Sequence, residues 1–309
     1  MMLNPDWSAA SSNDLYISAK QIASEYGATL QTHLLETKYE MIYNALNHGT
    51  TGGRRLADIG FLGPDVGVAH FVWPTDDDIK AVIDSGATVV HNPGSNLRLT
   101  SGISPVRVML DAGAKVAIGT DSISAGDEDD LFEEIRLAGQ LQRSNAMWGL
   151  DSGRVSSLSL LYGAAHHGPA LGGFGEDLGV IAAGNRADMV VLDRRRIFPP
   201  GKFDYSDPLD VIVDRARGSD VSTSIIDGRV VIRDRKMTTV DEDEVAVRCR
   251  EAAARTFADP PRWLLDLRPI VSELEPYVAD FFRKWDRIPI GPRYVYNTKD
   301  GPQVSESRG

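Results

Sequence analysis

Three histidines and one aspartate end four short apolar runs in the first half of the chain. The runs are "GATLQTH", "DVGVAH", "ATVVH" and "KVAIGTD", which end at His33, His70, His91 and Asp121. Glu36 follows the first run by three positions. Imidazole and carboxylate groups together suit a borderline cation such as zinc, and a carboxylate beside such a site can carry protons. Any one of them alone is more simply a polar strand end, but four in succession favour metal-assisted chemistry.

The surrounding sequence predicts the elements that would position these side chains. From residue 12 to about 170, short β-branched or apolar runs alternate with amphipathic segments of helix length, which is typical of βα units around a parallel sheet. We therefore expect an α/β fold with four strands. Ser12 can cap a helix through about Tyr26, and Gly49 can end the helix after the first strand. Carboxyl ends of parallel strands meet at one edge, where catalytic groups gather.

The pattern changes near residue 175. The runs "LGVIAAGNRADMVVLD" and "VSTSIIDGRVVIRD" are punctuated by Gly and Asp, which predicts antiparallel strands joined by tight turns. From "DEDEVAVRCREAAARTF" through "PIVSELEPYVADFFRKW" the period becomes helical, and the last fifteen or so residues are polar. We predict an α/β catalytic domain over residues 1–174, a β-sandwich segment over 175–240, and helices with a polar tail over 241–309.

Composition excludes several classes of protein. With 309 residues, 42% of them hydrophobic, the chain can bury a large core. Its net charge of −11 repels phosphate backbones and anionic lipid, so we expect no nucleic acid and no membrane partner. The single cysteine, Cys249, rules out an internal disulfide and suits a reducing compartment. The N-terminus has no signal-peptide pattern and no run approaches a membrane span, so we expect a cytoplasmic protein.

Several longer motifs resemble those of the amidohydrolase superfamily. They are "THLLET", "VAHFVW", "VVHNPGSNLRLTSGISPVRVMLDAGAKVAIGTDS", "DDLFEEIRLAGQLQR", and "GNRADMVVLD" with "IIDGRVV". Their order and spacing are similar to the cytosine-deaminase-like branch, which includes S-adenosylhomocysteine deaminases, guanine deaminases and triazine chlorohydrolases. The resemblance covers nearly all of residues 5 to 240. It implies a (β/α)8 barrel with a small β-sandwich, and one divalent metal, zinc with iron as the alternative.

The resemblance also implies a role for each matching residue. His33 corresponds to the fifth-strand metal ligand, and Glu36 to the proton shuttle. His70 corresponds to the sixth-strand histidine that polarises the substrate or the attacking hydroxide. Asp121 corresponds to the eighth-strand ligand and base. The implied reaction is attack of metal-activated water on an electron-poor ring carbon, with Asp121 accepting the proton, Glu36 protonating the neighbouring ring nitrogen, and ammonia or chloride leaving.

Other polar and aromatic residues have weaker interpretations. Trp73 forms an aromatic wall of the substrate pocket or, about equally well, packs in the core. We expect His91 to orient its loop rather than to bind metal, and Asn92 and Asn96 to cap backbone groups. The remaining histidines and an acidic run are assigned to helix packing, surface or helix dipole rather than to a site: His48, His166, His167, Asp127, Asp129 and Asp130.

Part of the implied metal site has no counterpart in the sequence. The family carries a His-x-His pair on its first strand, and no His-x-His occurs in this chain. Only 32 residues precede His33, whereas four βα units need on the order of 120. We therefore expect the C-terminal half of the barrel, the C-terminal part of the β-sandwich and terminal helices. Exposed edges of a half-barrel would favour a homodimer.

Two functions remain open from the sequence. The first is a metal-dependent hydrolase that cleaves a carbon–nitrogen or carbon–chlorine bond of a nucleobase-, nucleoside- or triazine-like ring, with a small heterocycle as its substrate. The second is a catalytically silent fragment that binds or assembles at most, because two ligands hold zinc far more weakly than a complete site. The residues that choose among ring substrates lie partly in variable loops, so the substrate itself is not specified.

Overall fold

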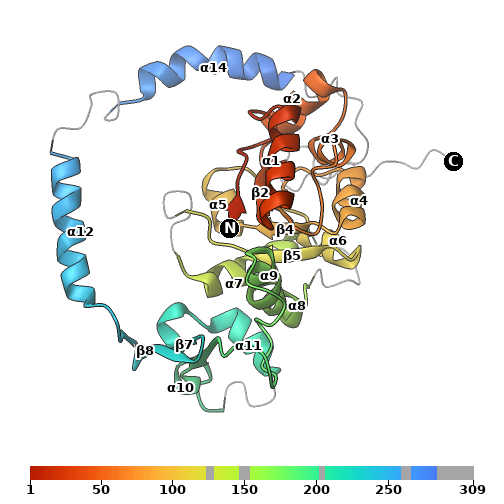
Figure 1. Ribbon diagram of the computed structural model, residues 1–309. Coiled ribbons are helices and arrows are strands. Elements are labelled where there is room, and N and C mark those ends of the chain that lie inside the picture. The colour runs from red at the N-terminus through yellow and green to blue at the C-terminus, as the bar shows by residue number, and fades with distance from the viewer. Residues whose placement is uncertain (123–128, 146–153, 202–205, 259–265, 284–309) are drawn as a thin grey trace.

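A five-stranded parallel sheet forms the centre of the larger part of the molecule (Figure 1). The computed structural model describes residues 1–122, 129–145, 154–201, 206–258 and 266–283. The strands, in spatial as well as chain order, are β1 (Met2–Leu3), β2 (Thr29–Leu34), β3 (Val66–His70), β4 (Thr88–His91) and β5 (Lys115–Ile118). The four predicted strands are confirmed as β2 to β5.

The prediction of four strands was one too few. β1 pairs with β2 through Met2 and Leu3, and an isolated parallel bridge joins Trp7 to His33. A strand of two residues with one hydrogen-bonded neighbour leaves no alternating apolar pattern in the sequence, which is why it was missed. Its consequence is local, because it brings residues 2–7 alongside the strand that carries His33.

Some helices of this part begin after a capping side chain and end at a left-handed glycine. The helices are α1 (Asn13–Tyr26), α2 (Lys38–His48), α3 (Gly52–Asp58), α4 (Asp76–Ser85), α5 (Pro93–Arg98), α6 (Val106–Asp111), α7 (Leu131–Leu141), the 3₁₀ turn η1 (Gln142–Asn145), α8 (Ser157–Tyr162), the π-helical η2 (Gly163–His167) and α9 (Gly168–Leu171). The Ser12 side chain accepts the Leu15 N–H, and Gly49 ends α2 in the left-handed conformation, as predicted.

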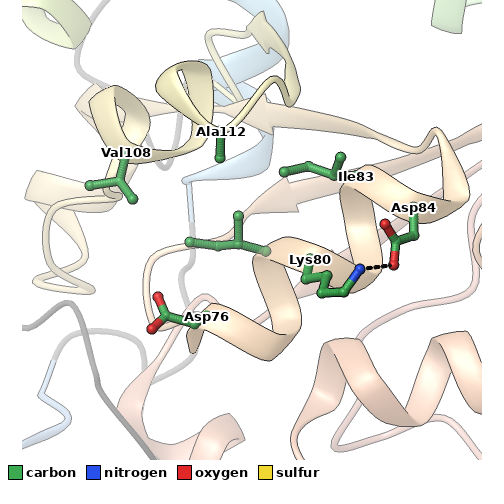
Figure 2. A pocket seen from close by; sticks show the side chains of 7 residues that line it. Asp76, Lys80, Ile83, Asp84, Val108 and Ala112 are labelled. Carbon is green, nitrogen blue, oxygen red and sulfur yellow. Dashed lines mark hydrogen bonds and ion pairs between the residues drawn. The ribbon is translucent and has the colours of Figure 1, made fainter.

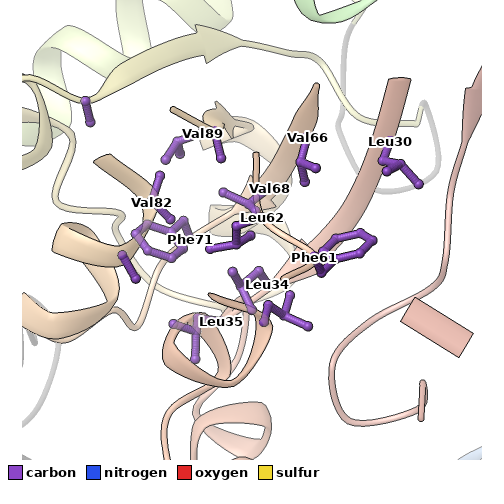
Figure 3. Packing of buried hydrophobic residues seen from close by; sticks show 14 of the residues in the cluster. Leu30, Leu34, Leu35, Phe61, Leu62, Val66, Val68, Phe71, Val82 and Val89 are labelled. Atoms are coloured by element: carbon purple, nitrogen blue, oxygen red, sulfur yellow. The ribbon is translucent and has the colours of Figure 1, made fainter. Parts of the chain in front are cut away.

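The core lies between the sheet and its helices. Along β2, Leu30, Thr32 and Leu34 are fully buried, while the alternate residues are only partly buried. The fully buried residues point toward one layer, because successive strand side chains face opposite sides of a sheet. Figure 3 shows this layer around Phe61 and Phe71. Its close packing fixes the strands and therefore the positions of the side chains at their ends.

A second, antiparallel sheet follows in the chain. It contains β6 (Met189–Leu192), β7 (Val221–Ile226), β8 (Arg229–Arg233) and β9 (Lys236–Met237), with α10 (Arg194–Ile197), α11 (Pro208–Arg215) and η3 (Gly218–Asp220) between β6 and β7. The predicted tight turn at Asp227 and Gly228 is confirmed by left-handed φ angles at both residues. Residues 178–184, which we grouped with the strands, form none: Gly179 and Gly184 are left-handed and Ile181 is 86% exposed.

Two predicted C-terminal helices are present as α12 (Glu242–Thr256) and α14 (Arg268–Phe282). Figure 1 shows both along the outside of the molecule, in blue. Neither contains a buried residue, although Phe281 near the end of α14 lies against Tyr39 of α2 with ring centroids 4.6 Å apart. Among the described helices, none is both long enough and apolar enough to cross a bilayer. The polar last fifteen residues lie outside the described ranges.

Candidate active site

The predicted site residues leave neighbouring strands at one edge of the parallel sheet. His33 is the next-to-last residue of β2, and His70 and His91 are the last residues of β3 and β4. In the ladder, Leu34 pairs with His70, and His91 pairs with Ile118 at the end of β5. Asp121 comes three residues after that strand. The common direction of the strands therefore places all of these side chains at the same edge, as expected for parallel strands.

His70 is the centre of the cluster. Its Nε2 atom lies 3.9 Å from Glu36 Oε2 and 3.9 Å from Asp121 Oδ2. Its ring stacks on that of His33, with centroids 5.4 Å apart and 15° between the planes. The side chain of His70 is 2% exposed, against 15% for Glu36 and 24% for Asp121. The structure thus brings together Glu36, His70 and Asp121, with His33 beside them.

Residues from α5 and the loop after it hold this cluster in place. Asn96 Oδ1 lies 2.9 Å from His70 Nδ1, and the Ser95 hydroxyl donates to Asp121 Oδ2 at 2.6 Å. The Ser101 hydroxyl donates to Glu36 Oε1 at 3.3 Å. Sequence reasoning missed both serines as site residues. The only available signal was their place just after the strand that ends at His91, where polar residues can turn toward the shared edge.

The predicted capping roles of the two asparagines are wrong. Asn92 occupies the N-cap position of α5 but makes no side-chain capping bond. Asn96, inside α5, contacts His70 instead of a backbone group. Because α5 begins at the strand edge beside His70, its polar side chains can bond to this histidine. For Asn96, the contact with His70 takes the place of a hydrogen bond to the helix backbone. The adjacent Asn96 Nδ2 is buried and has no partner among the described residues.

His91 is fully buried beside this cluster. Neither of its ring nitrogens has a hydrogen-bond partner within the described ranges. Burial lowers the pKa of His91 to about 3, and the nearby His70 acts in the same direction. The imidazole is therefore neutral at physiological pH. Its ring nitrogens therefore do not bond to Glu36 or Asp121 within the described ranges, and the expectation that it orients its loop stays a prediction.

The backbone at this edge is strained. Leu35, His70, Phe71 and Asp121 have φ angles of 53°, 71°, 48° and 61°. Residues other than glycine rarely adopt this left-handed region, and each instance costs of order 1–3 kcal/mol. Half of the non-glycine residues with positive φ in the described parts of the chain are these four, and the others are Thr100, Asp227, Asp234 and Arg235. Such clustering at strand ends is typical of functional sites.

Trp73 lies three residues after His70. Its indole Nε1–H donates to the carbonyl oxygen of Ser101 at 2.7 Å, and its ring packs in part against the core. Ser101 in turn contacts Glu36, so the tryptophan is joined to the site through one residue. Both of the roles expected from the sequence, packing and pocket wall, are compatible with this position.

The remaining polar residues singled out from the sequence lie elsewhere. His166 and His167 contact the carbonyl oxygens of Leu178 at 2.7 Å and Val116 at 3.1 Å, in line with the predicted packing role. Asp130 caps α7 through the Phe132 N–H, as predicted for the helix start. His48 is in the last turn of α2. Asp129 directly precedes the cap residue Asp130, and Asp127 lies outside the described residues.

The donor atoms fit a divalent metal in kind but supply only part of a site. His33 Nδ1 lies 3.2 Å from the carbonyl oxygen of Asp6, which as acceptor leaves the lone pair on Nε2. This is the usual arrangement of a metal-binding histidine. Asp121 is the carboxylate of the set, and zinc accepts both kinds of donor. Within the described ranges, however, no group of three or more His, Cys, Asp or Glu side chains is arranged to hold a metal.

A pocket of about 340 Å³ lies elsewhere, between α4 and α6 (Figure 2). Its walls include the side chains of Ile83 in α4, Val108 in α6 and Ala112 just after α6, with Lys80 paired to Asp84 at 2.6 Å. None of the strand-end residues lines it. The chemistry-bearing residues therefore assign the candidate site to the sheet edge, and the pocket marks only a gap between two helices.

A parallel α/β sheet with histidine and carboxylate side chains at its carboxyl edge places the molecule among α/β proteins whose site lies at the strand ends. The amidohydrolase family model matches residues 1–231. A 5'-deoxyadenosine deaminase of Methanosarcina mazei is 34% identical over 259 residues, which is 83% of this chain and 58% of that protein. The chain belongs to the amidohydrolase family. It spans little more than half the length of this curated relative.

Two solved structures share the fold. An adenosine deaminase from Xanthomonas campestris with bound zinc superposes with a TM-score of 0.76 at 24% identity, covering 82% of this chain and 56% of that one. A mutant of atrazine chlorohydrolase from Arthrobacter aurescens, in complex with zinc and atraton, gives 0.72 at 25% identity, covering 81% and 54%. The resemblance inferred from the sequence motifs is confirmed by these comparisons.

Proposed function

We propose that the chain forms the C-terminal half of a metal-dependent hydrolase that removes an amino group, or chloride in its place, from a nucleoside- or triazine-like ring. The observation that carries the proposal is the convergence of Glu36 and Asp121 on His70 Nε2, each at 3.9 Å. Two carboxylates flanking one imidazole can accept and deliver protons on either side of a bound ring. The relatives that deaminate 5'-deoxyadenosine favour a carbon–nitrogen bond of a purine nucleoside.

The proposed metal is zinc, with iron as the alternative, held here by His33 and Asp121. When bound, it would supply an activated water at neutral pH. Asp121 accepts the proton that the water loses, and the Ser95 hydroxyl fixes its Oδ2 atom at 2.6 Å. Glu36 delivers a proton to the ring nitrogen next to the attacked carbon. Trp73 is proposed to form one wall for the ring.

His70 is proposed to hydrogen-bond the substrate or the attacking oxygen through Nε2. This requires the proton of the neutral ring to be on Nε2. The buried and unpartnered Nδ2 of Asn96 supports such a state. Exchanging the positions of the amide oxygen and nitrogen of Asn96 directs Nδ2 at His70 Nδ1. The Asn96 N–H then has an acceptor, and Nδ1 of His70 accepts this hydrogen bond.

The remaining metal ligands are inferred to come from a barrel half that this chain does not contain. The relatives are longer, and the inner-facing residues of β2, such as Gln31 and His33, are only partly buried. The three-part division of the chain, the cytoplasmic location and the homodimer stay predictions.

The experiment compares the chain alone with a chimera that carries the part of the Methanosarcina mazei deaminase not matched here. Zinc per chain is measured by elemental analysis, and ammonia release from 5'-deoxyadenosine, adenosine, guanine and cytosine, and chloride release from a chlorotriazine, are assayed. We expect weak zinc binding and no turnover for the chain alone, and near-stoichiometric zinc with ammonia release for the chimera.

Two results would contradict this proposal. A folded, zinc-loaded chimera that releases neither ammonia nor chloride from any of these compounds favours the silent fragment. Near-stoichiometric zinc in the chain alone, with turnover on the order of 1 s⁻¹, would show that the site is complete without a second half.

A further inference from the structure

A buried carboxylate lies directly beneath the loop that carries Glu36. Glu40, in the first turn of α2, has no exposed surface. Its Oε2 atom accepts the backbone N–H of Glu36 at 2.9 Å, and its Oε1 atom accepts the hydroxyl of Ser8. The proposed mechanism makes no use of Glu40. Its hydrogen bond nevertheless goes to the residue that is proposed to move the proton.

The loop that Glu40 contacts cannot adopt its shape without support. Leu35, between the strand and Glu36, is left-handed, with φ at 53°. Its side chain is fully buried, and its carbonyl oxygen accepts the N–H groups of Val72 and Trp73, both at 2.9 Å. Side chain and carbonyl are thus fixed by the core and by the loop after β3. The amide side of the turn is the part that Glu40 holds.

Burying this carboxylate is costly, which argues that its contacts matter. Burial raises the pKa of Glu40 to about 7, while hydrogen bonds from Ser8 and from the backbone of Leu35 and Glu36 oppose the rise. Its surroundings are polar: Asn44 donates to the Ser8 hydroxyl at 2.7 Å, and Arg55 donates to Asn44 at 3.2 Å. No lysine or arginine forms a direct ion pair with Glu40 within the described ranges.

A second buried carboxylate offers a matched comparison. Asp78 in α4 is also fully buried, and it accepts the N–H groups of Thr75 at 2.9 Å and Arg54 at 3.1 Å. It therefore joins the starts of α3 and α4 by the same kind of contact. It has no hydrogen bond to Glu36 or Leu35. Asp78 is therefore a buried carboxylate that binds backbone N–H groups but does not contact the turn at Leu35 and Glu36.

We propose that Glu40 is a positioning residue for Glu36: its carboxylate fixes the backbone of the left-handed turn at Leu35 and Glu36, and so aims the Glu36 side chain at His70 and Ser101. The inference rests on the proposed function for the role of Glu36. The contact itself does not, so the two can be tested apart. Misplacement of a catalytic group by about 1 Å can lower a rate on the order of 10²-fold.

The first test is amide hydrogen exchange on the 309-residue chain. Glu40→Asp keeps the charge but is one methylene too short to reach the loop, and Glu40→Gln keeps the length and one acceptor oxygen. We expect Glu40→Asp to accelerate exchange at Leu35 and Glu36 by about tenfold or more, corresponding to 1.4 kcal/mol per tenfold change. Glu40→Gln should restore most of the protection. The control Asp78→Asn should accelerate exchange at Arg54 and Thr75 instead.

The outcomes separate positioning from general stability. Unchanged exchange at Leu35 and Glu36 in folded Glu40→Asp, or equal acceleration there by Asp78→Asn, would overturn the proposal. If Glu40→Asp does not fold, Glu40→Leu replaces it, because leucine fills a similar buried volume without an acceptor oxygen. Unchanged exchange at Leu35 and Glu36 in this variant overturns the proposal, and acceleration there that Asp78→Asn does not produce supports it.

The second test is kinetic and uses the zinc-loaded chimera. Glu40→Asp is expected to lower kcat by about tenfold or more with KM within about threefold, because the substrate site is kept and the proton carrier is displaced. Asp78→Asn, which also alters a buried carboxylate but not this loop, should keep kcat within about threefold. If every chimera is inactive, the proposed function fails, whereas the exchange experiment still decides the role of Glu40.

Discussion

The two sheets of this molecule differ in how much of their surface is buried. All five residues of β3 in the parallel sheet are buried, and its neighbours face a continuous core. In the antiparallel sheet, β6 and β8 contain no buried residue, and Val190 and Val191 are 53% and 48% exposed. Every proposed catalytic or metal-binding side chain lies on a strand of the parallel sheet or within three residues after one. The comparison suggests that rigidity from packing, rather than sheet formation alone, determines where chemistry can be placed.

The largest contrast is expected in catalysis. In the zinc-loaded chimera, Glu36→Gln should keep the metal and lower kcat by roughly 10²–10⁴-fold, the usual contribution of a general acid–base group. Asp188→Asn, beside the antiparallel sheet, should leave kcat within about threefold. Steady-state kinetics with elemental analysis of zinc provide the measurement. Turnover of Glu36→Gln within a factor of about three of the parent would remove this residue from the mechanism.

The next contrast is in stability. Phe61 is fully buried and meets Tyr16 edge-on, with ring centroids 4.7 Å apart. Phe61→Ala should lower the free energy of unfolding by about 3–5 kcal/mol, because it leaves a cavity in the packed layer. Val191→Ala, on the half-exposed β6, should cost less than about 1 kcal/mol. Denaturant unfolding of both variants measures the difference, and equal losses would mean that the two sheets are equally packed.

A third effect is the pH dependence caused by Glu40. The folded-state pKa is about 7 against an ordinary value of 4.5, so the unfolded chain releases this proton first as pH rises. The folded state should therefore lose about 3 kcal/mol relative to Glu40→Gln between pH 4.5 and 7, and little more above that. The difference between the two proteins isolates Glu40 from His91, whose lowered pKa has the opposite effect as pH falls. A difference that does not vary with pH would mean that the carboxylate ionises normally when folded.

The smallest effect concerns the contact between the two parts of the molecule. Asp130 accepts the Phe132 N–H at 3.0 Å as the cap of α7, and the Gly218 N–H at 2.8 Å just before β7. Asp130→Ala should cost about 1 kcal/mol for the cap. Limited proteolysis should then cut more readily near Gly218 than in β3. Unchanged cleavage around Gly218 would indicate that the two parts stay joined without Asp130.

The strands that could be predicted are those whose local pattern and tertiary position agree. β4 ends at His91 in both sequence and structure, because an apolar run followed by Pro93 leaves little freedom for the boundary. β1 could not be predicted, since two residues form a strand only when β2 is beside them. The run at residues 178–184 is the converse case: its composition suits a strand, but no described strand lies beside it.

The candidate site shows the same division. His70 and Asp121 could be predicted because each comes at the end of a short apolar run, and such runs recur along the sequence. The contact of Ser101 with Glu36 joins residues 65 apart in sequence, and no spacing rule indicates it. Glu40 is harder still, because a glutamate in the first turn of a helix is ordinarily a solvated partner of the helix dipole. Only the fold shows that this one is buried beneath the loop.

The left-handed residues at the strand ends have one further consequence. Leu35 and Phe71 are both fully buried, so their unfavourable backbone conformations are maintained by core packing together with the backbone hydrogen bonds around them. The energetic cost of shaping this edge is therefore met when the protein folds, before any ion or substrate arrives. Binding then requires little reorganisation of the polypeptide, and less of the affinity is lost to ordering it. With the edge of the sheet rigid before binding, any conformational adjustment on binding is made by the substrate and not by the protein.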